Sequence, residues 1–192
     1  AKRCAHDLLS RLDDEDKVSL VVYDTAIEVL LETMPVRLAR TLVPMRLAEV
    51  RANGGTALHA GWLKGAETLA PTAGSGMMSR VILLSDGQAN HGIINTQQIC
   101  DQVRELASAG VTTSTVGIGV DFNEELMTAI ANAGQGNSWY GERVEDLAES
   151  FDAEMGFLSS LAFQDVRVKL ETPLLPRMGQ IKVRNDYIQN SK

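Results

Sequence analysis

The sequence predicts an α/β fold: a doubly wound, mostly parallel sheet with helices on both faces and one antiparallel edge strand. Strand-like and helix-like patterns alternate through most of the chain, which is typical of this class. Residues Val81 to Leu84 form an unbroken apolar run, as expected for a strand covered on both faces. We therefore expect this run to be a central strand.

The first half of the chain predicts a helix, a hairpin and two further helical segments. Apolar residues recur at helical spacing at the start, and two Val- and Leu-rich runs flank the turn at Asp24. The later segments are two short helices or one kinked helix around Pro44, and then a helix that begins at Thr56. The expected ranges are 1–12, 17–23, 26–31, 35–50 and 56–69.

The second half continues the alternation. After the strand at 81–84, Asn95 and Gln98 resemble a capping box at the start of a helix, and Gly110 ends that helix. A Thr- and Val-rich strand follows, and then a helix that Asp121 is expected to cap. A short strand and a long final helix complete the pattern. The expected ranges are 95–110, 111–118, 121–134, 138–140 and 144–158.

From Ala162 the pattern changes, because apolar and charged residues alternate as in a half-exposed strand and prolines follow. We therefore expect one domain over 1–160 and the start of a β-rich segment over 161–192.

Composition narrows the possible partners. The 192 residues are 44% hydrophobic and carry a net charge of −7, with no basic run, so nucleic acid and anionic lipid are unexpected partners. No apolar stretch approaches the roughly 20 residues of a membrane span. Cys4 and Cys100 fall on apolar helix faces and are expected to be buried thiols.

Two polar residues are candidates for a binding site. Asp86 follows the apolar strand, at the edge where open α/β sheets bind ligands, but an Asp-Gly pair is also a common turn. Thr56 follows Gly54 and Gly55, and its ordinary role would be a helix N-cap. The residues alone leave both alternatives open.

The order of elements, the Gly54-Gly55-Thr56 loop and the Leu84-Ser85-Asp86-Gly87 turn together resemble the von Willebrand factor type A domain. The stretch Gly117 to Asn123 and the segment before the final helix extend the likeness over residues 1–160. The change after Ala162 resembles bacterial and inter-alpha-inhibitor-like members of the family. The resemblance implies a Rossmann-like doubly wound sheet.

It also implies a metal-ion-dependent adhesion site (MIDAS) at the carboxyl edge of the sheet. Thr56 and Asp86 match two parts of the family's pattern. The resemblance implies Mg²⁺, or Mn²⁺ or Ca²⁺, held by these oxygens and water, with a carboxylate from a partner protein in an open position.

The sequence departs from the family pattern in one respect. The motif Asp-x-Ser-x-Ser, which would contribute three of five ligand positions, does not occur in it. By resemblance, that motif and the family's first strand would precede Ala1. We therefore expect a gap in the sheet and weak metal binding by Thr56 and Asp86 alone.

Three functions follow as hypotheses. The first is a non-enzymatic, metal-dependent protein-binding module of the adhesion type. The second is a Mg²⁺-dependent phosphoryl-transfer enzyme on a similar sheet, for which the strand-end loops offer only Arg143 as a phosphate-binding cation. The third is a metal-free scaffold. His6, His59 and His91 have no partners at metal-ligand spacing and are not expected to bind metal.

Overall fold

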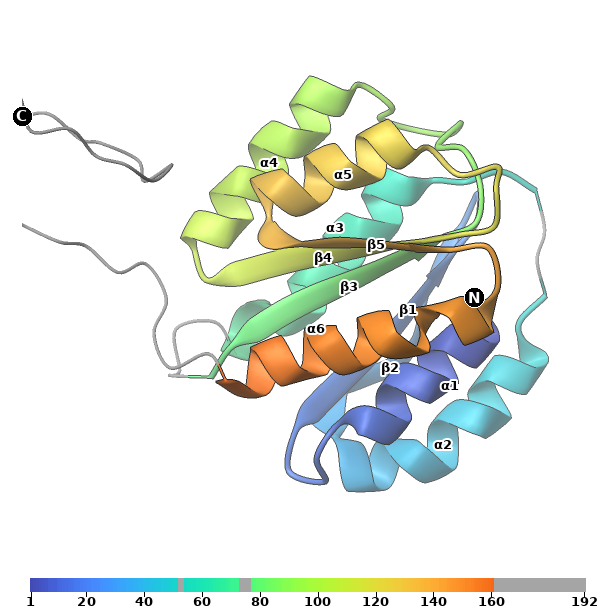
Figure 1. Ribbon diagram of the computed structural model, residues 1–192, viewed down its shortest axis with the longest axis vertical. Coiled ribbons are helices and arrows are strands. Elements are labelled where there is room, and N and C mark those ends of the chain that lie inside the picture. The colour runs from blue at the N-terminus through green and yellow to red at the C-terminus, as the bar shows by residue number, and fades with distance from the viewer. Residues whose placement is uncertain (52–53, 73–76, 161–192) are drawn as a thin grey trace, which may run out of the picture. The chain divides into compact units, whose positions relative to one another are not determined.

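A parallel three-stranded sheet and a separate antiparallel hairpin form the β-structure of the computed structural model, which describes residues 1–51, 54–72 and 77–160 (Figure 1). The order of the parallel strands is β3-β4-β5. The α/β class and the antiparallel hairpin are as predicted, and the sheet has the expected break, between the hairpin and β3. The strands are β1 (Lys17–Tyr23), β2 (Ile27–Pro35), β3 (Ser79–Ser85), β4 (Val111–Ile118) and β5 (Gln135–Gly141).

The strand expected at the centre, β3, instead lies at the edge of the parallel sheet, and β4 is central. The apolar run in β3 has a different cause. Val81 and Leu83 pack into one core cluster, while Ile82 and Leu84 pack against another on the opposite face. The apolar run therefore indicates that helices cover both faces of β3. It does not indicate that other strands pair with both edges of β3.

Three helices cover one face: α3 (Leu58–Leu69), α4 (Thr96–Ser108) and α5 (Glu124–Ala133). Their apolar residues meet β3 and β4 in the largest core cluster. Trp62 of α3 is fully buried there, and its indole N–H donates to the hydroxyl of Thr113 on β4 at 3.0 Å. A buried Trp needs such an acceptor, which the Thr-rich β4 supplies.

The other face carries α1 (Lys2–Arg11), α2 (Val36–Glu49), the 3-10 turn η2 (Val144–Leu147) and α6 (Ala148–Ser160). Helix α1 spans the two parts of the β-structure. Its Leu8 packs with β4 and α6, and its neighbour Leu9 packs with β2 and α2. The helix therefore contributes to two separate core clusters, one against β4 and α6 and the other against β2 and α2.

Several helix boundaries refine the predictions. Asn95 caps α4 by accepting from the amide of Gln98 at 2.9 Å, as predicted. The cap of α5 is Asn123 rather than Asp121. Residues 36–49 form one helix that contains Pro44, which is the single-helix alternative of the prediction. Another short 3-10 turn, η1 (Ala70–Thr72), follows α3.

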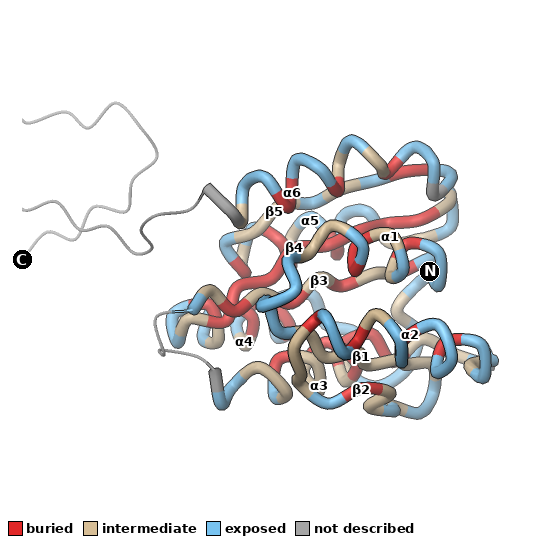
Figure 2. Tube along the Cα trace, turned by 90° about the horizontal axis from the view of Figure 1, so that it is seen from below, coloured by how far each residue is buried: buried red, intermediate tan, exposed pale blue. Residues whose placement is uncertain are grey.

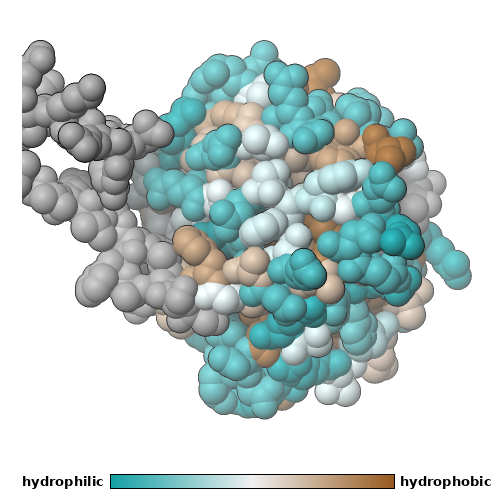
Figure 3. Space-filling view, viewed as in Figure 1, coloured by the Kyte–Doolittle hydropathy of each residue, from teal (hydrophilic) through white to brown (hydrophobic). Residues whose placement is uncertain are grey.

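Every residue of β4, the central strand of the parallel sheet, is buried, whereas β5 buries only Gly141 (Figure 2). On the face drawn in Figure 3, hydrophobic residues form small separate areas on a largely hydrophilic surface. Ala1–Ser160 form one compact unit. The expected β-rich segment, 161–192, lies outside the described residues. Among the described helices, none has the length and apolar character needed to cross a membrane.

Candidate functional site

Three loops meet at the carboxyl edge of β3: the β1–β2 turn, the loop before α3, and the loop after β3. The amide of Ala57 donates to the carbonyl of Asp24 at 2.7 Å, which joins the first two. Asn90 joins the second and third, because its side-chain oxygen accepts from the amide of Thr56 at 2.8 Å. Its own amide donates to the Thr56 carbonyl at 3.2 Å. Thr56 is thus held from both sides of its backbone.

Thr56 is not a helix N-cap. Helix α3 begins at Leu58 with Ala57 at the N-cap position, and no side chain caps it. The Thr56 hydroxyl instead lies beside the loop after β3, since a Cβ placed on Gly87 would be 3.6 Å from Thr56 Oγ1. The capping alternative is therefore wrong, and the hydroxyl has no hydrogen bond to the described residues.

Asp86 follows the last residue of β3 and is exposed. Its neighbour Ser85 is buried and donates to the carbonyl of Gly87 at 3.1 Å, which shapes the turn. Within the described part of the chain, the Asp86 carboxylate has no hydrogen bond or ion pair. Thr56 and Asp86 thus present uncommitted oxygens on adjacent loops.

Small residues keep these loops close together. A Cβ on Gly55 would lie 3.0 Å from the side-chain oxygen of Asn90 and 3.1 Å from Cγ2 of Thr25, closer than ordinary contact. Gly54 has a φ of +98°, which favours glycine. The Gly54-Gly55 pair therefore allows the β1–β2 turn and the Asn90 loop to approach Thr56.

Tyr23 ties β1 to β3 beneath this edge. Its hydroxyl donates to the carbonyl of Leu84 at 2.7 Å, across the break between the two sheets. Burial raises the pKa of Tyr23 most strongly; a hydrogen bond with Ser85 lowers this pKa by a lesser amount, and the charge of Asp86 adds the smallest effect, a further rise. The phenol therefore remains protonated and able to donate.

Apolar side chains from the loop after β4 and from the end of β5 adjoin the site, and are here called the rim. Val120 is 74% exposed, and the half-exposed ring of Tyr140 stacks on Phe122 with centroids 5.3 Å apart. Gln88, two residues beyond Asp86, donates to the carbonyl of Asp121 at 2.8 Å and links the rim to the site.

The oxygens at this edge suit a hard divalent cation, which prefers carboxylate, hydroxyl and water ligands. They do not form a complete cage. In residues 1–51, 54–72 and 77–160, no group of three or more His, Cys, Asp and Glu is placed to hold a metal. A cation at Thr56 and Asp86 would need most of its ligands from water or from other molecules or residues.

Sequence reasoning did not identify Asn90, Asp24 or Tyr23, which position the site. Asn90 carries a weak signal, because it lies four residues after Asp86 in a polar loop. Asp24 was interpreted only as a turn residue, and Tyr23 only as part of a strand.

A second polar cluster surrounds Glu154 of α6, near the other end of β3. This carboxylate is 1% exposed and accepts hydrogen bonds from Ser114 at 2.6 Å, Asn137 at 2.8 Å and Trp139 at 3.0 Å. Arg80 adds an ion pair at 3.0 Å. Burial opposes the charge, but these hydrogen bonds and Arg80 lower the pKa of Glu154. The cluster is satisfied internally and serves packing.

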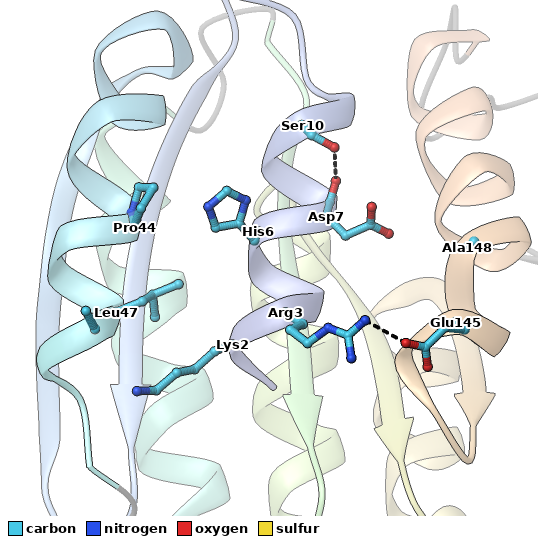
Figure 4. Close-up of a pocket in the computed structure, with 10 residues that line it drawn as sticks. Lys2, Arg3, His6, Asp7, Ser10, Pro44, Leu47, Glu145 and Ala148 are labelled. Atoms are coloured by element: carbon cyan, nitrogen blue, oxygen red, sulfur yellow. Dashed lines mark hydrogen bonds and ion pairs between the residues drawn. The ribbon is translucent and has the colours of Figure 1, made fainter.

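The other candidates do not join the site. His59 is buried and shares a hydrogen bond with Gln102 at 2.6 Å, while His6 and His91 are exposed. Cys4 and Cys100 are buried and unpaired, as expected, and burial raises the pKa of both thiols. A groove between α1, α2 and η2 (Figure 4) contains neither Thr56 nor Asp86.

Comparison with known proteins places this chain in one family. The model of the von Willebrand factor type A domain matches residues 1–153, and the chain belongs to that family. An uncharacterised protein of Synechocystis, sll0103, is 26% identical over 171 residues, which are 88% of this chain and 40% of that protein. The chain therefore spans less than half the length of this relative.

Solved structures support the fold. A von Willebrand factor type A protein from Catenulispora acidiphila superposes with a TM-score of 0.67 at 23% identity, covering 80% of this chain and 36% of the other. Proximal thread matrix protein 1 from the mussel byssus, solved with a zinc-occupied MIDAS motif, gives a TM-score of 0.60 at 17% identity. Here the match covers 80% of this chain and 38% of the mussel protein.

Proposed function

We propose that this domain is a non-enzymatic binding module that holds a divalent cation at the carboxyl edge of β3 and captures a carboxylate of a partner protein through it. The observation that carries the proposal is the pairing of two uncommitted oxygen groups, the Thr56 hydroxyl and the Asp86 carboxylate, on loops that Asn90 links. Family membership and the zinc-occupied site of the mussel relative support it.

The chain's residues have distinct roles in this proposal. Asp86 supplies the charged ligand, and Thr56 supplies a neutral oxygen whose position Asn90 fixes. A bound cation would supply positive charge to a partner's carboxylate, which the acidic loops alone would repel. The exposed rim of Val120 and Tyr140 offers apolar contact beside that carboxylate.

The phosphoryl-transfer alternative has little support among the described residues. Arg143, the cation expected to hold phosphate, pairs with Asp146 at 3.1 Å on η2 and its cap. The Asp86 loop itself contributes no Lys or Arg.

Calorimetric titration with Mg²⁺ and Mn²⁺ tests the proposal on the protein and two variants. Asp86→Ala should abolish measurable binding, because it removes the charged ligand. Asp101→Ala, which removes an exposed carboxylate on α4, should leave the affinity unchanged. Equal affinities in all three proteins would remove Asp86 from the site and favour a metal-free scaffold.

A further inference from the structure

The rim is an exposed apolar surface beside the candidate metal site. Val120, in the loop after β4, is 74% exposed, and Tyr140, at the end of β5, is 47% exposed. Phe122 stacks on Tyr140 with ring centroids 5.3 Å apart and packs against the largest core cluster. Isolated exposed apolar residues are ordinary, but an adjoining set at a sheet edge suits contact with another molecule.

The rim is held in place by contacts within the domain. The amide of Gly119 donates to the carbonyl of Gly141 at 3.0 Å, which joins the loops that follow β4 and β5. Gly117 leaves space for the Phe122 ring, because a Cβ at Gly117 would overlap that ring. A surface that is already ordered costs less to bind than one that its ligand must order. The rim is therefore a preformed contact surface.

A shallow hollow on the exposed side of α5 continues the rim. It measures about 560 Å³ and is lined by Glu124, Glu125, Thr128, Ala129 and Asn132. Glu124 connects the hollow to the rim, because its charge acts on the Tyr140 phenol. Partial burial raises the pKa of Tyr140, and the charges of Glu142, Glu124 and Asp146 raise it further. The apolar surface is thus bordered by carboxylates.

Among the described residues, the uncommitted charges of this surface are acidic. Asp121, Glu124, Glu125 and Glu142 are exposed, and their side chains make no hydrogen bond or ion pair within that part of the chain. Their negative charge is therefore available to a ligand.

The basic side chains of the neighbouring elements are already engaged. Arg143 pairs with Asp146 at 3.1 Å, Arg3 of α1 pairs with Glu145 at 2.6 Å, and Arg104 of α4 pairs with Asp101 at 2.8 Å. Lys2 of α1 donates to the carbonyl of Val50, just beyond α2, at 2.6 Å. Each of these arginines is thus offset by a carboxylate outside the rim and the hollow.

The groove shown in Figure 4 has mixed charges instead, because Lys2, Arg3 and His6 line it together with Asp7 and Glu145. Mixed charges select no particular kind of partner. The rim and the α5 hollow combine apolar side chains with uncommitted charges of one sign, so the complementary partner is apolar and basic.

We propose that the rim and the α5 hollow dock a segment of another protein in which apolar side chains are flanked by Lys and Arg. The apolar side chains pack on Val120 and Tyr140, and the flanking cations pair with Glu124 and Glu142. A cation close to the Tyr140 ring also gains from the negative face of that ring. This contact goes beyond the proposed function, because it requires neither a bound divalent cation nor a carboxylate in the partner.

Other occupants fit this surface less well. A second copy of the chain paired through the same surface would bring these carboxylates against one another. Nucleic acid and an anionic membrane would be repelled in the same way. A divalent cation lacks ligands here, because no group of three or more His, Cys, Asp and Glu in residues 1–51, 54–72 and 77–160 is placed to hold a metal.

Selection from a displayed library of short peptides tests this proposal. The central positions are varied among Leu, Ile, Phe and Ser, and the flanking positions among Lys, Arg, Glu and Gln. Selection is carried out in EDTA and at about 0.15 M salt, where charges farther apart than about 8 Å are largely screened. We expect enrichment of apolar residues at the centre and of Lys or Arg at the flanks.

Fluorescence anisotropy of the enriched peptides locates the surface that binds them. Glu124→Lys/Glu142→Lys should weaken binding about tenfold, because it reverses the charges that attract the flanks. Val120→Ser should weaken binding about threefold, because it removes apolar contact area. Peptides whose Lys and Arg are replaced by Glu should instead bind Glu124→Lys/Glu142→Lys more tightly than the parent protein.

Matched controls lie elsewhere on the domain. Glu15→Lys/Glu49→Lys makes the same change of net charge at exposed positions before β1 and at the end of α2, and should leave binding unchanged. Met45→Ser removes a 66% exposed apolar side chain from α2 and should also leave binding unchanged. Asp86→Ala should bind the peptides as the parent does, so the rim contact and the metal site can each fail independently of the other.

Four results would refute the proposal. One is failure to enrich Lys and Arg at the flanks, and another is binding that survives both Glu124→Lys/Glu142→Lys and Val120→Ser. Equal weakening by the two double charge reversals would show that only the net charge of the protein matters. Dimerisation in sedimentation that is lost in Val120→Ser would assign the surface to a second copy of the chain.

Discussion

The parallel strands β3 and β4 and the hairpin β1–β2 differ in how their residues are covered. Every residue of β4 is buried, whereas no residue of β1 is fully buried and β2 buries only Leu31. Helices pack on both faces of β3 and β4 in two separate clusters. A hydrophobic run in a strand therefore indicates that helices cover both faces of that strand. It does not indicate whether other strands pair with both of its edges.

Tyr23 and helix α3 connect the two regions. Tyr23 donates to Leu84 across the break, and its ring fits against Gly61, where any side chain would overlap it. Helix α3 contributes a second link, since the Thr68 carbonyl accepts from Thr33 of β2 at 2.8 Å. The candidate site thus depends on the placement of a hairpin that lacks strand pairing with β3.

The largest expected effect concerns the charge buried in the parallel region. Glu154→Ala leaves Arg80 buried without its counter-charge, and should cost about 3–5 kcal/mol of unfolding free energy. Urea denaturation measures this. Glu149→Ala, an exposed carboxylate on the same helix, should stay within about 0.5 kcal/mol. A similarly small loss for both would show that the cluster contributes no stability.

The lowered pKa of Glu154 predicts that the free energy of unfolding depends on pH. Because the folded pKa of Glu154 is lowered from its ordinary value of 4.5, its contribution is complete above that value and is lost as pH falls through the folded pKa. Denaturation of the protein and Glu154→Gln between about pH 3 and pH 7 measures the difference. The difference in unfolding free energy between the protein and Glu154→Gln should become smaller as the pH falls. A difference that grows would contradict a lowered pKa for Glu154.

The next effect compares the cores directly. Leu83→Ala empties a fully buried position in β3 and should cost about 2–5 kcal/mol. Leu20→Ala in β1 removes a half-buried side chain and should cost about 1–2 kcal/mol. Equal losses in urea denaturation would show that the hairpin is as firmly packed as the parallel sheet.

The smallest effect concerns the link between the regions. Tyr23→Phe removes only the hydroxyl that donates to Leu84, and should cost about 1–2 kcal/mol because a part-buried carbonyl loses its donor. Tyr140→Phe, whose hydroxyl has no recorded donor or acceptor role among the described residues, is the control and should be neutral. Thermal unfolding that leaves both variants unchanged would mean that Tyr23 does not tie the hairpin to β3.

Much of the fold could be predicted from local patterns. The alternation of elements, the hairpin at Asp24 and the Asn95 cap depend on nearby residues and are confirmed. The edge position of β3 was not predicted, because strand order depends on pairing between distant segments. The start of α3 was also missed, because the hydrogen bond between Thr56 and Asn90 forms across 34 residues.

The sequence identified Thr56 and Asp86 as candidate site residues. The residues that position them were identified only in the structure. The roles of Asn90 and Tyr23 depend on bonds between loops far apart in the chain, which residue type alone does not reveal. That the two candidates share one ion stays a prediction.

Paramagnetic broadening of amide signals by Mn²⁺ tests the central claim most directly. At low Mn²⁺ concentration, the account predicts that the amides of Thr56, Gly87 and Asn90 broaden first, and that Asp86→Ala abolishes this. Asp101→Ala should leave the pattern intact. Broadening centred on the acidic turn at Asp13 to Asp16, or unchanged broadening in Asp86→Ala, would contradict a metal site at the carboxyl edge of β3.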